Sequence, residues 1–315
     1  MPSYQTNPGR ARHRLAVVSL LAAVGLWACD GSEEPPTATS AAPAAPQTKA
    51  AAKKALIAFA SDRDSQHNYG IYVMTPDGRR QMRLTNTSLI ALWPAWSPDR
   101  TKLAFAAFTD PLSQSRIYVM NADGTNLRRL TSDAPYGDNN PDWSPDGSRI
   151  AFERNGEIII IDADGTNPTA VPHLTDDADR VPSWSPDGTK LAVARDRGFT
   201  QIEKIWVISL DGTEAVQLTD GSSQATDPEW SPDGSRIAFV TNREGPAHVY
   251  VMNADGTGQT RLTTVGPSGW PSWSPDGSRL AIAAAGDIYV VNADGSNPTR
   301  VTDDPADDST PAWGP

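Results

Sequence analysis

The sequence contains one cysteine, Cys29, so the 315-residue chain cannot form a disulfide within itself. It has only four histidines, and none stands in the His-Glu-x-x-His spacing of a metalloprotease site. No Gly-x-Ser-x-Gly motif is present, which argues against a hydrolase built on a nucleophile elbow. Basic residues are also few, 27 against 38 acidic ones, for a net charge of −11. This balance argues against nucleic acid and anionic lipid headgroups as partners.

The first 28 residues lack acidic side chains and carry Arg10, Arg12 and Arg14. The apolar run that follows, residues 15–28, is too short for a stable transmembrane helix. Residues 1–28 are therefore predicted to be a signal peptide. The sequence Leu-Trp-Ala-Cys at 26–29 resembles a bacterial lipobox, which implies cleavage before Cys29 and lipidation of that residue. The alternative is an ordinary signal peptide cut a few residues away, with Cys29 incidental.

Residues 29–55 contain no large apolar side chain and are rich in alanine and proline. Such a composition cannot build a core and is typical of a flexible tether. Fully extended, it would span roughly 80 Å. We therefore expect an exported protein of the bacterial cell envelope, attached to the membrane through its lipid alone.

One phrase recurs through the rest of the chain, as WSPDRTKLAF, WSPDGSRIAF, WSPDGTKLAV, WSPDGSRIAF and WSPDGSRLAI. Its tryptophans are followed by a last Trp313 and lie 47, 41, 46, 43 and 40 residues apart. Pro-Asp-Gly favours a tight turn, and the apolar run after it favours a strand. A second apolar run, a turn such as Asn-Ala-Asp-Gly and a short segment such as Arg-Leu-Thr complete the repeat. Four strands in this length are typical of a propeller blade.

The number of repeats predicts six blades, but the first blade begins with a middle strand and the sequence ends with a Pro-x-Trp strand. Six middle strands begin at Ile57 and its equivalents, and six Pro-x-Trp strands follow them, the last at Pro311–Trp313. We therefore predict that this last strand completes the blade that begins at Ile57. Such a closure would leave no open sheet edge.

The WSPDG and NADGT signatures resemble those of the TolB-type six-bladed propellers. The resemblance covers residues 56–315 and implies an all-β propeller of four-stranded antiparallel blades. TolB itself carries an α/β domain before its propeller, whereas this sequence has the tether there. The Asn-Ala-Asp-Gly segments also resemble the start of a calcium loop, but they lack its downstream glutamate. We interpret them as hairpin turns and expect no cofactor, with calcium at acidic loops left open.

In an antiparallel blade, the two kinds of repeated turn lie at one end, and links of variable sequence lie at the other. Binding residues are usually carried on variable loops over a rigid scaffold. These loops are acidic and include several aromatic residues, which suits a basic protein surface or peptide. The alternative is that aspartate is simply a good loop residue. The candidate partner-binding residues are Trp93, Asp133, Tyr136, Asp138, Asp177, Asp179, Asp227, Trp270, Asp303, Asp304, Asp307 and Asp308.

The absence of catalytic motifs favours a non-enzymatic interaction module, expected to be monomeric, that binds an envelope protein or peptide. Two other functions stay open from the sequence. One is a metal-assisted hydrolase or lyase acting on an extracellular polymer or lactone, with carboxylates at the channel mouth holding the metal. The other is a carbohydrate-binding or sensor propeller.

Overall fold

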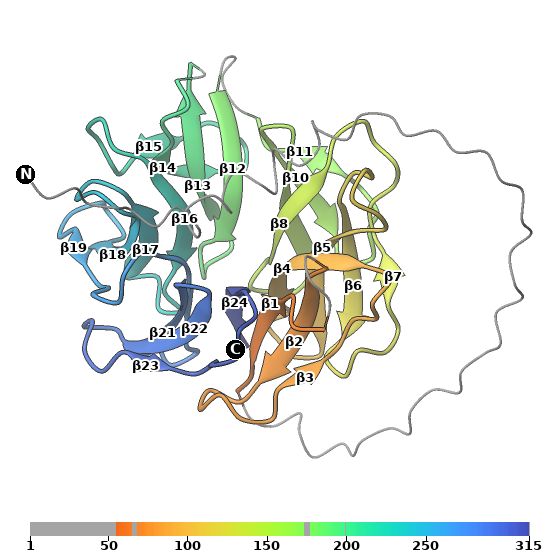
Figure 1. The fold of residues 1–315 in the computed structure, drawn as a ribbon. Coiled ribbons are helices and arrows are strands. Elements are labelled where there is room, and N and C mark those ends of the chain that lie inside the picture. The colour runs from red at the N-terminus through yellow and green to blue at the C-terminus, as the bar shows by residue number, and fades with distance from the viewer. Residues whose placement is uncertain (1–54, 65–67, 173–176, 199, 315) are drawn as a thin grey trace, which may run out of the picture. The chain divides into compact units, whose positions relative to one another are not determined.

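A computed structural model describes residues 55–64, 68–172, 177–198 and 200–314 (Figure 1). The predicted signal peptide, Cys29 and most of the predicted tether lie outside these described residues. The described chain forms strands and turns, and it contains no helix long and apolar enough to span a membrane.

The strands form six antiparallel sheets of four strands each, which are the predicted six blades. The strands of each blade are given from the axis outward. Blade 1 comprises β24 (Asp308–Trp313), β1 (Ile57–Ser61), β2 (Gly70–Met74) and β3 (Met82–Arg83), and blade 2 comprises β4 (Ile90–Trp96), β5 (Lys102–Phe108), β6 (Arg116–Asn121) and β7 (Arg128–Arg129). Blade 3 comprises β8 (Asp138–Trp143), β9 (Arg149–Arg154), β10 (Glu157–Asp162) and β11 (Thr169–Ala170). Blade 4 comprises β12 (Asp177–Trp184), β13 (Lys190–Arg197), β14 (Lys204–Ser209) and β15 (Ala215–Gln217), and blade 5 comprises β16 (Ala225–Trp230), β17 (Arg236–Thr241), β18 (His248–Asn253) and β19 (Thr260–Arg261). Blade 6 comprises β20 (Ser268–Trp273), β21 (Arg279–Ala284), β22 (Asp287–Asn292) and β23 (Thr299–Arg300).

The repeated Ser-Pro-Asp-Gly turn is held by its own side chains. In blade 3 the amide of Gly147 donates to the carbonyl of Ser144 at 2.8 Å, and Gly147 has a φ of +70°. The carboxylate of Asp146 accepts from the Ser144 hydroxyl at 2.6 Å and from the Ser148 amide at 3.0 Å. These hydrogen bonds, the Ser144 one first, lower the pKa of Asp146 to about 2. The motif is therefore explained by local turn geometry.

The C-terminal strand closes the ring, as predicted. β24 pairs with β1, with Trp313 opposite Ile57 and Ala312 opposite Ala58. The Trp313 amide donates to the Ser272 hydroxyl of blade 6 at 2.9 Å. On the other side, the Trp96 indole of blade 2 donates to the Ala312 carbonyl at 3.2 Å. The last strand thus joins blade 1 to both of its neighbours.

The core lies between adjacent blades. Phe59, Phe105, Phe152 and Phe239 hold equivalent positions in four blades and are fully buried. One cluster joins Ala104 and Ile117 of blade 2 to Phe152 and Ile159 of blade 3, and the other clusters repeat this arrangement. The apolar runs are continuous because both faces of most blade strands are covered.

The six Pro-x-Trp strands surround the axis, and each contacts the inner strands on both sides (Figure 1). We call the end of the propeller that carries the repeated turns the turn face, and the opposite end the loop face. The loop face carries the links between the second and third strands of each blade and the links between blades. β1 begins at the turn face, where the Gly314 amide donates to the Leu56 carbonyl at 2.7 Å. The segment before β1 therefore joins the propeller at the turn face.

Candidate functional site

Three of the predicted binding residues are well exposed on the loop face. The Asp133 side chain is 90% exposed and contacts the Arg129 guanidinium at 2.5 Å. Tyr136, three residues later in the same loop, is 50% exposed. Asp303 is also exposed, in the loop before β24. These side chains are accessible to a partner.

Four predicted carboxylates are instead buried, so the expectation that they lie on an exposed acidic face is wrong. Asp138 and Asp308 are 0% and 1% exposed, and Asp179 is 1% exposed. Asp138 accepts two hydrogen bonds from Arg154, at 2.6 and 2.9 Å. Asp179 accepts two from Arg195, at 2.6 and 2.7 Å.

The other two buried carboxylates also lie beside arginine, with different geometry. Asp308 receives both bonds, at 2.9 Å each, from Arg63. Asp177 is 7% exposed and lies 3.6 Å from a guanidinium nitrogen of Arg195. Paired in this way with arginine, a carboxylate can be buried at the start of an inner strand.

The arginines of these pairs also pack on aromatic rings of their own blades. The Arg154 guanidinium lies 5.3 Å from the Phe152 ring, and Arg195 lies 5.3 Å from Trp206. These arginines therefore join the loop-face end of each inner strand to the blade core. Their carboxylate partners stabilise the scaffold.

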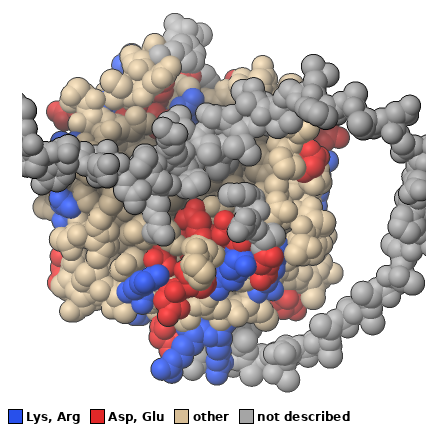
Figure 2. Space-filling model, in the orientation of Figure 1, with Lys and Arg blue, Asp and Glu red and all other residues tan. Residues whose placement is uncertain are grey.

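Two further predicted residues lie where the ring closes and are partly buried. Asp304 contacts Arg63 at 2.8 Å, and Asp307 accepts from the Tyr69 hydroxyl at 2.6 Å. Both contacts join the loop after β1 to the loop before β24. Acidic and basic side chains are interleaved over the region of β1 and β24 on the visible surface (Figure 2). This part of the loop face is a network of mixed charge.

The remaining predicted residues, Trp93, Asp227 and Trp270, occupy one repeated position on the inner strands. Each directly precedes the proline of Pro-x-Trp, lies in a β-bulge and has a positive φ, between +48° and +53°. The other three blades carry Asn140, Val181 and Thr310 there, with the same backbone conformation. Positive φ is uncommon for any residue with a side chain and is an outlier for β-branched ones. Identical backbones thus present five residue types around the axis.

The sequence interpretation missed the residue between Pro and Trp, which differs from blade to blade. Asp142 of blade 3 accepts from the Trp184 amide of blade 4 at 2.8 Å. Ser183 of blade 4 accepts from the Trp230 amide of blade 5 at 3.2 Å. In blade 5 this residue is Glu229. The varied residue in an otherwise constant tripeptide was the signal that could have identified this position.

Asp142 and Glu229 have no arginine or lysine partner among the described residues. Burial raises the pKa of Asp142 to about 7, against hydrogen bonds from the Trp184 and Trp143 amides. Burial, and then the negative charge of Asp142, raise the pKa of Glu229 well above its usual range. The two carboxylates therefore compete for protons and form an interacting pair beside the axis.

A network of ion pairs and hydrogen bonds links blades 3 to 5. Asn140 donates to Glu153 at 3.1 Å, and the Arg180 guanidinium lies 3.6 Å from the other Glu153 oxygen. Arg180 also donates to Glu203 at 2.6 Å, and Gln224 donates to Glu203 at 2.8 Å. Burial raises the pKa of Glu153 to about 7, opposed by the Arg180 charge. Because the Arg180 side chain is 41% exposed, a bound partner can reach it.

The described residues include no group of three or more His, Cys, Asp or Glu side chains placed to hold a metal ion. The Asn-Ala-Asp-Gly segments act as turns: the Asp123 carboxylate accepts from the Thr125 amide at 3.0 Å and from its hydroxyl at 2.6 Å. The geometry thus supports the interpretation of these segments as hairpins.

Comparisons with known proteins agree with this architecture. The family profile described as TolB beta propeller domain matches residues 48–198 and 157–269. The solved TolB of Acinetobacter baumannii is 23% identical, with a TM-score of 0.71, over 83% of this chain and 67% of that one. A putative TolB from Agrobacterium tumefaciens is 20% identical, with a TM-score of 0.63, over 79% and 88% of the two chains. An oligogalacturonate lyase in complex with manganese is 18% identical, with a TM-score of 0.52, over 80% and 74%. No curated protein sequence matches the chain.

Proposed function

Because this chain belongs to the TolB β-propeller domain family, we propose that it is a non-enzymatic interaction module of the bacterial cell envelope. It binds a protein or peptide through the loop face and the mouth of the central channel. The observation that carries this proposal is the set of six bulged positions on the inner strands. One backbone conformation there carries Trp, Asn, Val, Asp, Trp and Thr, and all of these except the buried Thr310 are partly exposed. A constant scaffold with varied side chains is typical of a binding surface.

The chemistry of the loop face supports a partner with basic and apolar side chains. Asp133 and Tyr136 are exposed in one loop, and Trp93 and Trp270 are partly exposed nearer the axis. Aromatic anchors with carboxylates at the rim favour such a partner. The buried carboxylates Asp138, Asp177, Asp179 and Asp308 enter the proposal only as supports of this surface.

The place where the chain enters the propeller supports the accessibility of this site. Residues 55 and 56 lead into β1 at the turn face. With Cys29 lipidated, the anchor chain would join the propeller on the side opposite the loop face. The flexible tether would then leave the loop face accessible to a partner. A Cys29→Ala variant of the full chain should move from the membrane to the soluble envelope fraction, and unchanged partitioning would contradict the anchor.

The binding proposal is tested by crosslinked pull-down from the native envelope with two matched variants of the full chain. Asp133→Lys with Tyr136→Ala changes one charge and one exposed ring on the loop face. Glu214→Lys with Val216→Ala makes the same kind of change at β15, where Val216 is 56% exposed. We expect a stoichiometric partner to be lost with the first variant and kept with the second. Loss with the second alone would place the interface elsewhere. The absence of a cofactor stays a prediction, with calcium at the acidic loops left open, and metal analysis of the purified chain measures it.

A further inference from the structure

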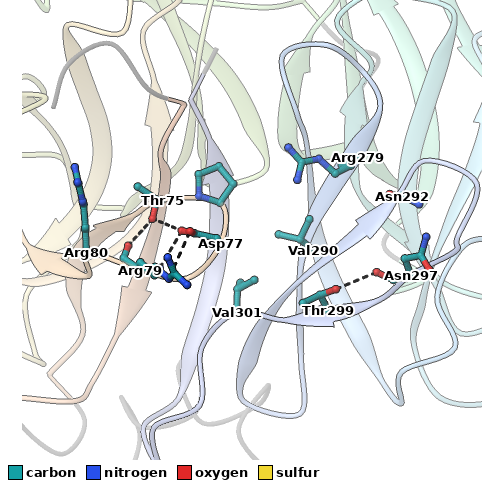
Figure 3. A pocket seen from close by; sticks show the side chains of 11 residues that line it. Thr75, Asp77, Arg79, Arg80, Arg279, Val290, Asn292, Asn297, Thr299 and Val301 are labelled. Atoms are coloured by element: carbon teal, nitrogen blue, oxygen red, sulfur yellow. Dashed lines mark hydrogen bonds and ion pairs between the residues drawn. The ribbon is translucent and has the colours of Figure 1, made fainter.

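A polar groove lies between blades 6 and 1, on the turn side of the propeller, and has a volume of about 650 Å³ (Figure 3). One wall is the β2–β3 turn of blade 1, including Thr75, Asp77, Arg79 and Arg80. The opposite wall belongs to blade 6 and comprises Arg279, Val290, Asn292, Asn297, Thr299 and Val301. Three arginines therefore border one groove of a chain whose net charge is −11. Arg79 forms an ion pair with Asp77 at 3.7 Å, and the Arg80 side chain extends away from blade 6 (Figure 3).

The turn in blade 1 departs from the repeated turn at Arg79. The other five blades carry Thr or Ser at this position, directly after Asp-Gly. That hydroxyl donates to the turn aspartate, as in Ser296 to Asp294 at 2.6 Å. Arg79 cannot make this bond, and the hydroxyl of Thr75 bonds to Asp77 instead. The Arg79 side chain instead forms an ion pair with the Asp77 carboxylate at 3.7 Å.

The next residue, Arg80, departs from the pattern in its backbone. Its φ is +56°, and the equivalent residues Asn126, Asn167 and Asn297 have the same left-handed conformation at +53°. Asparagine tolerates this conformation, whereas arginine adopts it at a cost. The Arg80 guanidinium makes no hydrogen bond or ion pair with the described residues that would offset this cost. Departures from local rules without a structural gain are expected at functional positions.

On the opposite wall, Arg279 is held in place while its donors stay free. Its guanidinium lies 4.9 Å from the Trp313 ring. The equivalent Arg236 lies 4.6 Å from Trp273 and also donates, at 3.2 Å, to the Gly277 carbonyl of the next blade's turn. Blade 1 has no such turn, because β24 and β1 come from opposite ends of the propeller sequence. The side-chain N–H groups of Arg279 have no acceptor among the described residues, as is also true of the equivalent Arg149.

The short side chain of Thr299 lines the groove and does not bridge it. Thr299 pairs with Val290 in blade 6 as Arg128 pairs with Val119 in blade 2. Arg128 crosses the junction to blade 3 and donates to the carbonyls of Ala163 and Asp164, at 3.0 Å each. Thr299 cannot make this crossing, so the corresponding space between blades 6 and 1 stays accessible.

We propose that this groove is a second binding site, which takes the carboxylate side chains of an acidic peptide segment from a partner protein. Asp77 stays ionised, because its pKa is lowered first by the Thr75 hydroxyl and also by the Arg79 amide. Three arginines and one aspartate leave the groove with a charge of +2. Guanidinium groups bind carboxylates through paired hydrogen bonds, and the side chains of Asn297 and Thr299 can bond peptide groups between them. The site is separate from the loop face, so the two faces can engage different proteins.

The test is fluorescence anisotropy of a fluorescein-labelled octapeptide of alternating Glu and Gly with the full chain, at low ionic strength. Arg80→Asn installs the residue of three other blades and removes one charge. Arg100→Gly is the matched control, since it removes one exposed arginine from a Ser-Pro-Asp turn where the other blades carry glycine. The double variant Arg79→Thr with Arg80→Asn restores the common turn sequence. Thermal unfolding of each variant confirms that it folds.

We expect saturable binding of the Glu peptide and no binding of a Gln-Gly peptide of the same length. Arg80→Asn should weaken binding by about 3- to 10-fold, the double variant by more than 10-fold, and Arg100→Gly by less than 2-fold. Equal weakening by Arg80→Asn and Arg100→Gly would show a general charge effect and overturn the site. Absence of Glu-peptide binding would also overturn it, as would displacement of the peptide by an equimolar amount of inorganic phosphate.

Discussion

Besides the carboxylate pair of Asp142 and Glu229, three kinds of aspartate occur among the described residues, and their local environments differ. In the repeated turns it is exposed and accepts bonds from the adjacent hydroxyls and amides, as Asp146 does. At the start of inner strands it is buried against arginine, as Asp179 is. In the loops between blades it can be fully accessible, as Asp133 is. Only the third kind is available to a partner without loss of stability.

This division predicts opposite results for two conservative substitutions. Asp179→Asn should destabilise the fold by about 3 kcal/mol, because it leaves the buried Arg195 without its bidentate partner. Asp133→Asn should change stability by less than about 0.5 kcal/mol, since its ion pair is exposed. Urea unfolding of both variants measures the difference. Equal effects would contradict the assignment of Asp179 to the scaffold.

The carboxylate pair beside the axis predicts a pH effect. Folding raises the pKa of Asp142 from 3.8 to about 7, so the folded state binds more protons than the unfolded chain between these values. The stability that the Asp142 carboxyl group contributes to the fold is therefore lost as the pH rises from 3.8 to about 7. Asp142→Asn keeps a hydrogen-bond acceptor for the Trp184 amide but carries no charge.

We expect Asp142→Asn to be more stable than the unsubstituted chain at pH 8, and this advantage to exceed the smaller one at pH 5 by about 2 kcal/mol, because part of the window already lies below pH 5. Unfolding of both proteins at pH 5, 6.5 and 8 gives the difference, in which the other titrating groups largely cancel. A variant that is less stable at pH 8 would contradict the account of the pair.

At the scale of elements, the second turn of each blade is set by contact with the preceding blade. A Cβ added to Gly295 would lie 2.6 Å from the Leu262 carbonyl oxygen, and one added to Gly124 would lie 3.0 Å from that of Leu84. Each glycine also has a positive φ, +84° and +83°. The glycine of the Asn-Ala-Asp-Gly turn is thus required twice, by its backbone conformation and by the close approach of the neighbouring blade.

A matched pair of substitutions separates these two requirements. Gly221 has a φ of +81° but nothing within 4 Å of an added Cβ. We expect Gly221→Ala to cost about 1 kcal/mol, from the conformation alone. Gly295→Ala should cost about 2–4 kcal/mol, since the neighbouring carbonyl must also move. Thermal unfolding compares the two, and a Gly221→Ala cost as large as that of Gly295→Ala would contradict the contact account.

At the scale of the whole molecule, ring closure depends on one strand from the far end of the chain. Deleting residues 308–315 removes the pairing of β24 with β1 and the buried Trp313, which is 6% exposed. We expect this deletion to lower the melting temperature by more than about 10 °C or to prevent folding, because it opens an edge in blade 1 and exposes the core beside it. Circular dichroism during heating measures the effect. An unchanged melting temperature would show that the ring does not need the strand.

Much of this architecture could be predicted from the sequence, because each blade repeats the same turn chemistry. Blade number, strand order and closure by Pro311–Trp313 follow from the phase of the repeats. The binding surface could be predicted only in part. Asp133 and Asp179 both look like loop aspartates, and burial depends on whether an arginine of the next strand lies opposite. Asp138–Arg154 and Asp179–Arg195 share a separation of 16 residues, so this signal was present in the sequence.

The central claim is that partners bind the loop face, and site-specific photocrosslinking in the native envelope tests it most directly. A photoreactive phenylalanine derivative replaces Tyr136 on the loop face or Val216 on β15, positions that are 50% and 56% exposed. The account predicts that the probe at residue 136 captures a discrete partner protein, and that the probe at residue 216 does not capture it. Capture of that partner at residue 216 and not at residue 136 would contradict the claim.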